Sequence, residues 1–215
     1  MKTINFQIIT KDFDFEERFE YLSEIAAAAV GSSAGVLQLR NKNISSRSLY
    51  DCAVFLKKKL DNLNNRGKTL FIINDRPDIA HIVGADGVHV GQDDFPADKI
   101  KKFFPNLIVG VSAENVKQAE AAEKDGADYI GAGPLYKTYS KKDAGDAMAK
   151  ETFNSICSSV DIPVIAIGGI TEDKIEELAE LGAGGVAVIG AVSNADDPLA
   201  AAIKFRNHID KFIKL

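Results

Sequence analysis

The stretch LIVGVSAENVKQAEAAEKDGADYIGA, at residues 107–132, contains one complete strand–helix–strand unit. Residues 107–112 form an apolar β-type run, and residues 113–125 are rich in alanine and charged side chains, as is typical of a helix. Gly126 marks the end of this helix, and the next β-type run follows at residues 129–132. Strands joined through a helix pair in parallel, with a right-handed crossover. The stretch therefore indicates a parallel α/β protein.

The same alternation covers the whole chain. The strand candidates are residues 4–10, 35–40, 69–74, 87–90, 107–112, 129–132, 164–167 and 186–189. The helix candidates between them include residues 46–63, 113–125 and 171–181. Eight strand–helix units in a chain of this length predict a closed (β/α)8 TIM barrel. An open doubly wound sheet is the alternative, but the even spacing and the lack of a Gly-x-Gly-x-x-Gly turn after the first strand favour the barrel.

Composition and charge narrow the class of protein. The 215 residues are 46% hydrophobic with a net charge of −5, which fits a globular protein without a general nucleic-acid footprint. No segment reaches the length of a membrane span, no signal peptide is visible, and no long linker divides the chain. Cys52 and Cys157 fit no metal spacing and are expected to be reduced core residues. We therefore expect one cytoplasmic domain over residues 1–215, with small-molecule partners, no nucleic acid and no membrane; the sequence leaves a homo-oligomer open.

Two neighbouring strand candidates end in carboxylates. Asp75 follows residues 69–74, and Asp93 and Asp94 follow the fourth strand. Since neighbouring parallel strands end at the same edge of a sheet, Asp75 and Asp94 are expected to converge, and two such carboxylates repel unless a cation lies between them. Mg²⁺ takes hard oxygen ligands and completes its shell with substrate phosphates. The alternative is that each aspartate only caps the helix that follows it.

The second strand candidate ends in three polar side chains that alternate to one side, Gln38, Arg40 and Lys42. A solvated loop explains Lys42 but not a glutamine inside an apolar strand. A guanidinium and an ammonium group that converge on one point can bind a diphosphate. We therefore interpret these residues as part of a ligand site.

The ends of the later strands carry hydroxyls and glycines. Ser112 either caps the helix after it or contacts a ligand, and the hydroxyl- and lysine-rich residues 135–143 form either a solvated loop or a lid. Gly169 and Gly190 follow the last two strands, where the backbone N–H groups of a TIM barrel bind phosphate. His89 lies within a strand and is interpreted as a wall residue rather than a catalytic base.

Taken together, these blocks resemble the thiamine phosphate synthase family. The resemblance spans about residues 36–198 and rests on QLRNK at 38–42, NDR at 74–76, ADGVHVGQDD at 85–94, GVS at 110–112, DYIG at 128–131, GP at 133–134, TYSK at 138–141 and IGGI at 167–170. So many blocks in the right order make a specific match. The resemblance implies a Mg²⁺-dependent transferase that couples hydroxymethylpyrimidine diphosphate to thiazole phosphate by a dissociative displacement and releases diphosphate.

The resemblance also implies roles for individual residues. Asp75 and Asp94 would hold Mg²⁺. The residues implied to bind the pyrimidine diphosphate are Gln38, Arg40, Lys42, Asn74, Ser112 and Lys141. The residues implied to bind the thiazole phosphate are Thr138, Ser140, Gly169, Ile189 and Gly190. Those implied to be catalytic are Arg40, Lys42, Ser112 and Lys141.

Three positions depart from the family pattern. Asn41 stands where a glutamate is frequent and is expected to face away from the site. Ser140 replaces a usual threonine and keeps the hydroxyl. Gly190 replaces a usual serine, so a hydroxyl contact to phosphate is lost while the backbone N–H remains.

Two other functions compete with this interpretation, a thiazole tautomerase of the same fold and a non-catalytic sensor of a phosphate ligand. Such tautomerases resemble the synthases but carry a histidine just after the serine of the fifth strand, whereas this chain has Ala113 and Glu114. They also tend to lose the diphosphate clamp. Binding a monophosphate needs neither the two acids nor Arg40, Lys42 and Lys141, so the synthase is favoured.

Overall fold

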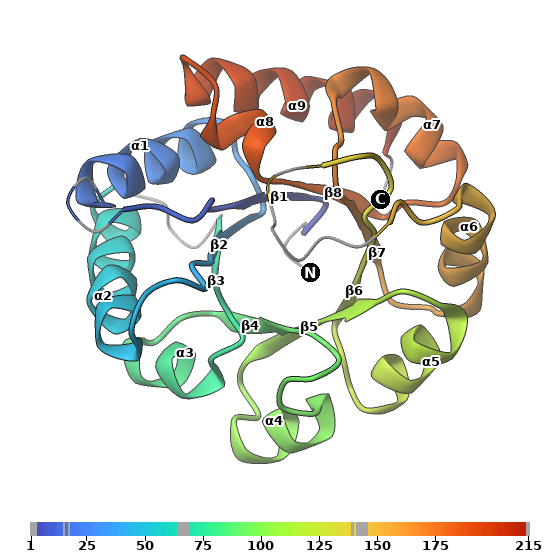
Figure 1. Ribbon diagram of the computed structural model, residues 1–215, viewed down its shortest axis with the longest axis horizontal. Coiled ribbons are helices and arrows are strands. Elements are labelled where there is room, and N and C mark those ends of the chain that lie inside the picture. Colours follow the sequence, from blue (N-terminus) through green and yellow to red (C-terminus); the bar gives the residue numbers. More distant parts are fainter. Residues whose placement is uncertain are drawn as a thin grey trace.

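The computed structural model describes residues 4–14, 16, 18–63, 69–138, 140 and 146–213. In these ranges, parallel strands β1 to β8 close into a barrel in sequence order, and the helices surround it (Figure 1). The strands are β1 Phe6–Ile9, β2 Val36–Leu39, β3 Leu70–Asn74, β4 Gly87–Val90, β5 Ile108–Ala113, β6 Tyr129–Ala132, β7 Val164–Ile167 and β8 Gly185–Val188. The helices are α1 Arg18–Gly31, α2 Ser46–Asn62, α3 Pro77–Val83, α4 Ala97–Phe103, α5 Val116–Lys124, α6 Lys150–Ser159, the 3₁₀-helix η1 Glu172–Lys174, α7 Ile175–Glu180, α8 Gly190–Ser193 and α9 Pro198–Phe212.

The barrel closes where β1 pairs with β8, with Gln7 opposite Ala187. An open doubly wound sheet would leave its two outermost strands as edges, so this pairing excludes it. The predicted TIM barrel is therefore confirmed. The predicted strand ends agree with the observed ones to within two residues.

Two hydrophobic layers hold the barrel together, and β2 contributes to both. Val36 lies in the inner layer, and Gln38 lines a small cavity there. Leu37 and Leu39 lie in the outer layer, between the strands and the helices. This alternation is the period of two that a strand imposes on its side chains. The inward positions at the carboxyl end of each strand are therefore the ones that reach a site on the barrel axis.

Two aspartates at the amino ends of strands support the fold rather than the site. Asp86 Oδ2 accepts the N–H of Phe71 at 2.8 Å. Asp128 Oδ2 accepts the N–H of Val109 at 2.7 Å and pairs with Lys101 Nζ at 2.6 Å. Each carboxylate thus supplies an acceptor to a buried strand N–H, which would otherwise be costly to leave unpaired.

The helix boundaries were predicted less well than the strands. The predicted helix 113–125 begins only at Val116, because β5 continues to Ala113, where it still pairs with β6. Asn115 caps this helix, since its Oδ1 accepts the N–H of Gln118 at 3.0 Å. The capping alternative for Ser112 is therefore wrong. The predicted helix 171–181 is divided into η1 and α7.

The two cysteines lie in helices, Cys52 within the hydrophobic core and Cys157 packed against it. Cys52 is buried in α2 and Cys157 is half-buried in α6, and both are free thiols. Burial raises the pKa of Cys52 to about 11 and that of Cys157 to about 12, so both stay protonated at neutral pH. Across the residues that the structure describes, no helix is both long enough and apolar enough to cross a membrane.

Candidate active site

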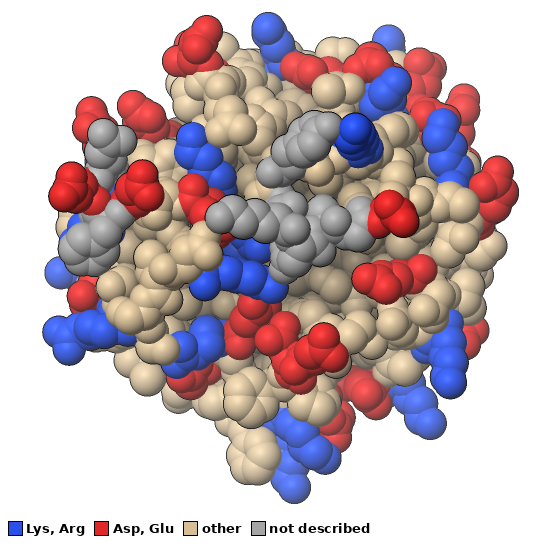
Figure 2. All heavy atoms as spheres, in the orientation of Figure 1, with Lys and Arg blue, Asp and Glu red and all other residues tan. Residues whose placement is uncertain are grey.

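A cavity of about 340 Å³, here called the main cavity, lies at the carboxyl ends of the strands. Small-molecule sites have volumes of roughly 300–1,000 Å³, so the main cavity is large enough for such a ligand. The predicted site residues that line it are Lys42, Ser112, Thr138, Ser140, Gly169, Ile189 and Gly190. Figure 2 shows this face of the molecule, with basic and acidic side chains next to one another near its centre.

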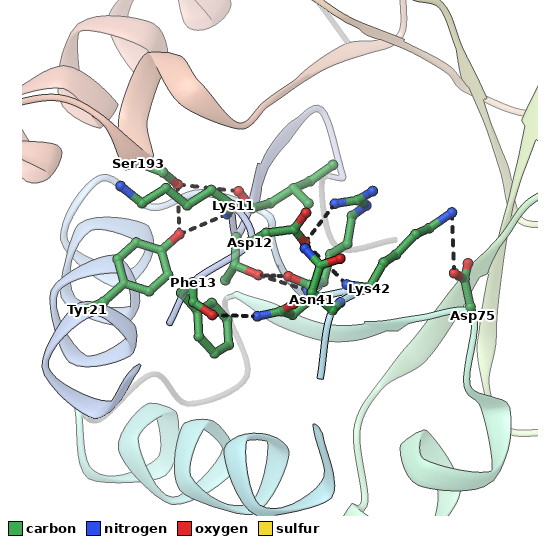
Figure 3. Close-up of polar contacts among 12 residues, drawn as sticks. Lys11, Asp12, Phe13, Tyr21, Asn41, Lys42, Asp75 and Ser193 are labelled. Atoms are coloured by element: carbon green, nitrogen blue, oxygen red, sulfur yellow. Dashed lines mark hydrogen bonds and ion pairs between the residues drawn. The ribbon is translucent and has the colours of Figure 1, made fainter. Parts of the chain in front are cut away.

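The two predicted metal ligands lie side by side, next to Lys42. Lys42 Nζ is 3.9 Å from Asp75 Oδ2 (Figure 3). Burial, the charge of Asp94 and a hydrogen bond with Asp94 raise the pKa of Asp75 to about 6, while Lys42 and Arg40 act against this rise. Asp94 Oδ2 also accepts the N–H of Gly91 at 2.7 Å, which orients that carboxylate. The structure thus brings together the acids that end β3 and β4.

Neither acid caps the helix that follows it. The N-cap of α3 is Arg76 and that of α4 is Pro96, and no side chain makes a capping hydrogen bond at either helix start. Asp75 instead has a φ of 62°, in the left-handed region that aspartate tolerates better than most residues. The capping alternative is therefore wrong for Asp75 and Asp94. Asp93 is exposed and lines the main cavity.

The carboxylate oxygens of Asp75 and Asp94 are suitable ligands for a hard cation. Burial and the charge of Asp94 both raise the pKa of Asp75, and a cation bound between the two carboxylates would offset their repulsion. Within the described residues, no group of three or more His, Cys, Asp or Glu side chains could hold a metal ion. A site with two carboxylates suits Mg²⁺, because this ion keeps several waters and takes further ligands from substrate phosphates.

The polar end of β2 lies deeper than Lys42. Gln38 is 2% exposed and Arg40 is 3% exposed. Gln38 Nε2 is buried without a hydrogen-bond partner among the described residues, and the side chain lines a cavity of about 20 Å³ on the barrel axis. A buried amide donor without an acceptor is costly, so this group is available to a ligand or a water.

Asp12, in the segment after β1, contacts two of the predicted site residues but was not itself predicted from the sequence. Its Oδ1 pairs with Arg40 Nη1 at 3.2 Å and accepts the backbone N–H of Lys42 at 3.2 Å (Figure 3). One carboxylate therefore contacts the guanidinium group of Arg40 and the backbone of Lys42, the two members of the expected diphosphate clamp. The signal was present, because Asp12 follows a strand end just as Asp75 does.

Asn41 faces away from the main cavity, as predicted. Its side chain is buried, and its Nδ2 donates to the carbonyl oxygen of Phe13 at 3.0 Å (Figure 3). Its Oδ1 accepts the N–H of Asn43 at 3.0 Å. The residue therefore braces the segment after β1 against the end of β2.

The opposite side of the main cavity is formed by β6, β7 and β8. The hydroxyl of Thr138 accepts the N–H of Ser140 at 3.3 Å. A Cβ atom added to Gly190 would lie 2.8 Å from Ser140 Oγ, so this hydroxyl occupies the space over Gly190. Gly190 begins α8, whose first N–H groups have no acceptor within the helix. Hydroxyls and free N–H groups together suit a phosphate.

Gly169 has a second role besides access to its N–H. Its φ is 64°, and an added Cβ would lie 2.6 Å from the carbonyl oxygen of Lys137. The chain after β6 therefore packs directly on the end of β7, where Tyr136 N donates to Gly168 O at 3.0 Å. This contact carries Thr138 to the edge of the main cavity.

The other predicted residues lie as follows. Asn74 is half-buried at the end of β3, and Ser112 is half-buried in β5 with its Oγ 3.0 Å from His89 Nε2. His89 is a hydrogen-bonded wall residue, as predicted, since its Nδ1 is 3.1 Å from Tyr129 Oη. Lys141, predicted to contact the diphosphate, lies outside the described residues.

Comparison with known proteins gives a match that covers most of the residues that carry the resemblance found in the sequence. The sequence model of one family, described as thiamine monophosphate synthase, matches residues 6–192. The chain belongs to the thiamine monophosphate synthase family. The match runs from β1 into α8, so it takes in every predicted site residue from Gln38 to Gly190.

Curated relatives and a solved structure of this thiamine monophosphate synthase family cover almost the whole chain. A thiamine-phosphate synthase of Archaeoglobus fulgidus is 40% identical over 201 residues, 94% of this chain and 91% of the relative. A thiamine-phosphate synthase of Methanococcus maripaludis is 39% identical over 196 residues, 90% of this chain and 92% of the relative. The structure of a thiamine phosphate pyrophosphorylase from Pyrococcus furiosus superposes with a TM-score of 0.84 at 33% identity, covering 99% of this chain and 98% of that one.

Proposed function

We propose that the protein couples hydroxymethylpyrimidine diphosphate to thiazole phosphate, giving thiamine phosphate and diphosphate. The observation that carries this proposal is one cavity with two ends of unlike chemistry. At one end Lys42 contacts Asp75, and at the other Ser140 lies over Gly190. A diphosphate with its metal ion suits the first end and a monophosphate the second. Relatives about 40% identical are named for this activity, which supports the same assignment.

The first end would bind the diphosphate. Arg40 offers a planar fork of donors, fixed by Asp12, and Lys42 offers a mobile point charge. Asp75 and Asp94 would hold Mg²⁺, which when bound supplies positive charge to the leaving diphosphate. The Nε2 of Gln38 lies deeper and has no hydrogen-bond partner among the described residues. It would donate to the pyrimidine ring, whose nitrogens are acceptors.

The reaction breaks one bond and forms one. The bond between the pyrimidinylmethyl carbon and the diphosphate oxygen breaks, and its electron pair leaves with the diphosphate. The resulting cation is stabilised by the electron-rich pyrimidine, and the thiazole nitrogen donates its lone pair to form the new carbon–nitrogen bond. No strong base is needed, so the chain's own groups have to stabilise charge on the leaving group and align the two substrates.

The competing functions leave parts of this site without a role. A tautomerase needs a group that moves a proton at the thiazole, but Ser112 is followed by Ala113, which is 1% exposed and has no such group. A sensor of a monophosphate needs only the end formed by Ser140 and Gly190. Neither function explains the acid pair beside Lys42 or the fixed guanidinium of Arg40, so these contacts favour the coupling reaction.

The decisive experiment mixes the purified protein with both substrates and Mg²⁺ and measures thiamine phosphate as thiochrome fluorescence. We expect product that depends on both substrates and disappears with a chelator. Folded protein that forms no product under these conditions would overturn the proposal and favour the tautomerase or the sensor.

A matched pair of variants tests the metal site. Asp94→Asn removes one of the two proposed ligands, and we expect kcat/KM to fall by about 10²-fold or more. Asp98→Asn changes an exposed aspartate of α4 and is expected to leave the rate unchanged. Mg²⁺-dependent turnover at the wild-type rate in Asp94→Asn would contradict the assignment of this ligand.

A further inference from the structure

A chain of hydrogen bonds runs inside the barrel and ends at the floor of the main cavity. Tyr129 Oη on β6 is 3.1 Å from His89 Nδ1 on β4, and His89 Nε2 is 3.0 Å from Ser112 Oγ on β5. Tyr129 is only 1% exposed, whereas Ser112 is half-buried and lines the main cavity. The chain therefore connects a fully buried hydroxyl with one that a ligand can reach.

Two glycines reserve the space for this chain. A Cβ atom on Gly110 would collide with the ring of Tyr129 and would lie 2.5 Å from His89 Nδ1. A Cβ atom on Gly131 would lie 2.9 Å from His89 Cε1. Because β5 and β6 have glycine at these positions, there is room for the rings of Tyr129 and His89, and the two glycine backbones pack closely against them.

The direction of the hydrogen bonds follows from the burial of Tyr129. Burial raises the pKa of this phenol, so it keeps its proton at neutral pH. Within the part of the chain that the structure describes, His89 Nδ1 is the one hydrogen-bond partner of the Tyr129 hydroxyl. A buried donor without an acceptor is costly, so Tyr129 donates to Nδ1. A neutral imidazole whose Nδ1 accepts carries its proton on Nε2.

The proton on Nε2 decides what Ser112 can do. His89 Nε2–H donates to Ser112 Oγ, and the serine's own proton is left for an acceptor in the main cavity. In the opposite tautomer, Ser112 would donate to Nε2 and turn lone pairs toward the cavity, where they would repel an anion. The tautomer of His89 therefore sets the polarity of the hydroxyl that the ligand meets.

We propose that Tyr129 and His89 are positioning residues that make Ser112 a hydrogen-bond donor to an oxygen of the leaving diphosphate. This inference rests on the proposed function for the identity of the acceptor, but not for the direction of the hydrogen bonds. Diphosphate oxygens only accept hydrogen bonds, and they gain negative charge as the carbon–oxygen bond breaks, so the donor stabilises the transition state more than the bound substrate.

The first test reads the tautomer directly, without any activity. In ¹⁵N-labelled wild-type protein at neutral pH, long-range ¹H–¹⁵N correlation spectra of the imidazoles should show His89 protonated at Nε2 and bare at Nδ1. The chain has three histidines, and loss of one set of signals in His89→Gln assigns the ring. A proton on Nδ1, or on both nitrogens, would overturn the proposal whether or not the protein makes thiamine phosphate.

The second test uses the rate of the coupling reaction. Tyr129→Phe removes the hydroxyl that selects the tautomer, and we expect kcat to fall about tenfold with little change in KM, the low end of what loss of an orienting group costs. Ser112→Ala should cost about 10²-fold, and adding Tyr129→Phe to it should cost nothing more, because both act through one hydroxyl. Tyr50→Phe removes a half-buried tyrosine hydroxyl in α2 as the matched control.

The outcomes separate this inference from the proposed function. Product formation with a wild-type kcat in Tyr129→Phe would overturn the positioning role and leave the coupling reaction intact. Absence of product in the wild-type protein would overturn the coupling reaction, and the NMR result would then decide the direction of the hydrogen bonds alone. If the kcat losses of Tyr129→Phe and Ser112→Ala add fully in the double variant, Tyr129 does not act through the hydroxyl of Ser112, and the proposal is rejected.

Discussion

Lys42 Nζ lies 3.9 Å from Asp75 Oδ2, so the ammonium group that follows β2 contacts the carboxylate that follows β3. Asp94, which follows β4, lies close to the same carboxylate, and burial together with the charge of Asp94 raises the pKa of Asp75. Three consecutive strand ends therefore contribute one charge each to a single cluster. Because its two acids repel each other, the protonation of Asp75 reports on the whole cluster.

We expect Asp75 to make the stability of the metal-free protein fall between about pH 4 and about pH 6. Burial and Asp94 raise the pKa of Asp75 to about 6 in the folded state, above the value of about 3.9 for an unfolded chain. Below this window the carboxyl is protonated in both states. As the pH rises, the unfolded chain loses the proton first, so the free energy of unfolding decreases until the folded carboxyl also ionises.

Urea unfolding of wild type and Asp75→Asn at several pH values measures this effect. The variant should gain stability relative to wild type as the pH rises through the window and then keep a constant advantage. Asp78→Asn is the control with the opposite sign, because a hydrogen bond from Arg76 lowers the pKa of Asp78. That variant should lose stability relative to wild type as the pH rises. A difference between Asp75→Asn and wild type that does not change with pH would contradict the prediction.

The sequence identified strand ends better than contacts between loops, for a physical reason. An apolar run bounded by glycine or polar residues reveals a buried strand locally, so Asp75 and Asp94 could be placed at one edge from the chain alone. The hydrogen bond by which the N–H of Gly91 orients Asp94 is not visible in that pattern. Helix starts depend on where a strand stops pairing, so the sequence alone suggests Ser112 as a cap although Asn115 is the N-cap in the structure.

Contacts between segments far apart in the chain carry no local signal. Asp12 and Arg40 meet because β1 and β2 are paired, and Ser140 reaches Gly190 because the chain after β6 packs across the end of β7. The resemblance to the family implies that Gly190, which replaces a usual serine, lacks a hydroxyl contact to the phosphate. The structure adds that the hydroxyl of Ser140 occupies the space that a serine at this position would need.

Asp12→Ala should weaken binding of the pyrimidine diphosphate. Arg40 is 3% exposed, so loss of its carboxylate partner should lower the free energy of unfolding by about 1–3 kcal/mol and release the guanidinium from its bound orientation. KM for the diphosphate substrate should rise severalfold. Asp12→Asn keeps an oxygen acceptor for Lys42 N–H and should lie between the alanine variant and wild type. Wild-type KM and stability in Asp12→Ala would show that Asp12 does not orient the clamp.

Gly190→Ala should raise KM for the thiazole phosphate without harm to the fold. The new Cβ would lie 2.8 Å from Ser140 Oγ, and a serine hydroxyl can move away cheaply. We expect the free energy of unfolding to change by less than about 1 kcal/mol, as for most substitutions outside the core. Ser140→Ala should raise KM by a similar factor, because it also removes the contact of the Ser140 hydroxyl with the phosphate. The KM of the double variant should be no higher than that of either single variant. Fully additive effects on KM would contradict this interpretation.

Asp128→Ala should destabilise the barrel and leave catalysis unchanged. The carboxylate accepts the N–H of Val109, which is fully buried, and pairs with Lys101 at the end of the barrel opposite the main cavity. Removing an acceptor from a buried N–H costs about 1–3 kcal/mol, so the urea midpoint should fall while kcat and KM of the folded fraction stay at wild-type values. Asp125→Ala, an exposed aspartate at the end of α5, is the matched control and should alter neither quantity. A loss of kcat in Asp128→Ala larger than its loss of folded protein would mean that this aspartate, which belongs to one of the blocks shared with the family, also acts on the site.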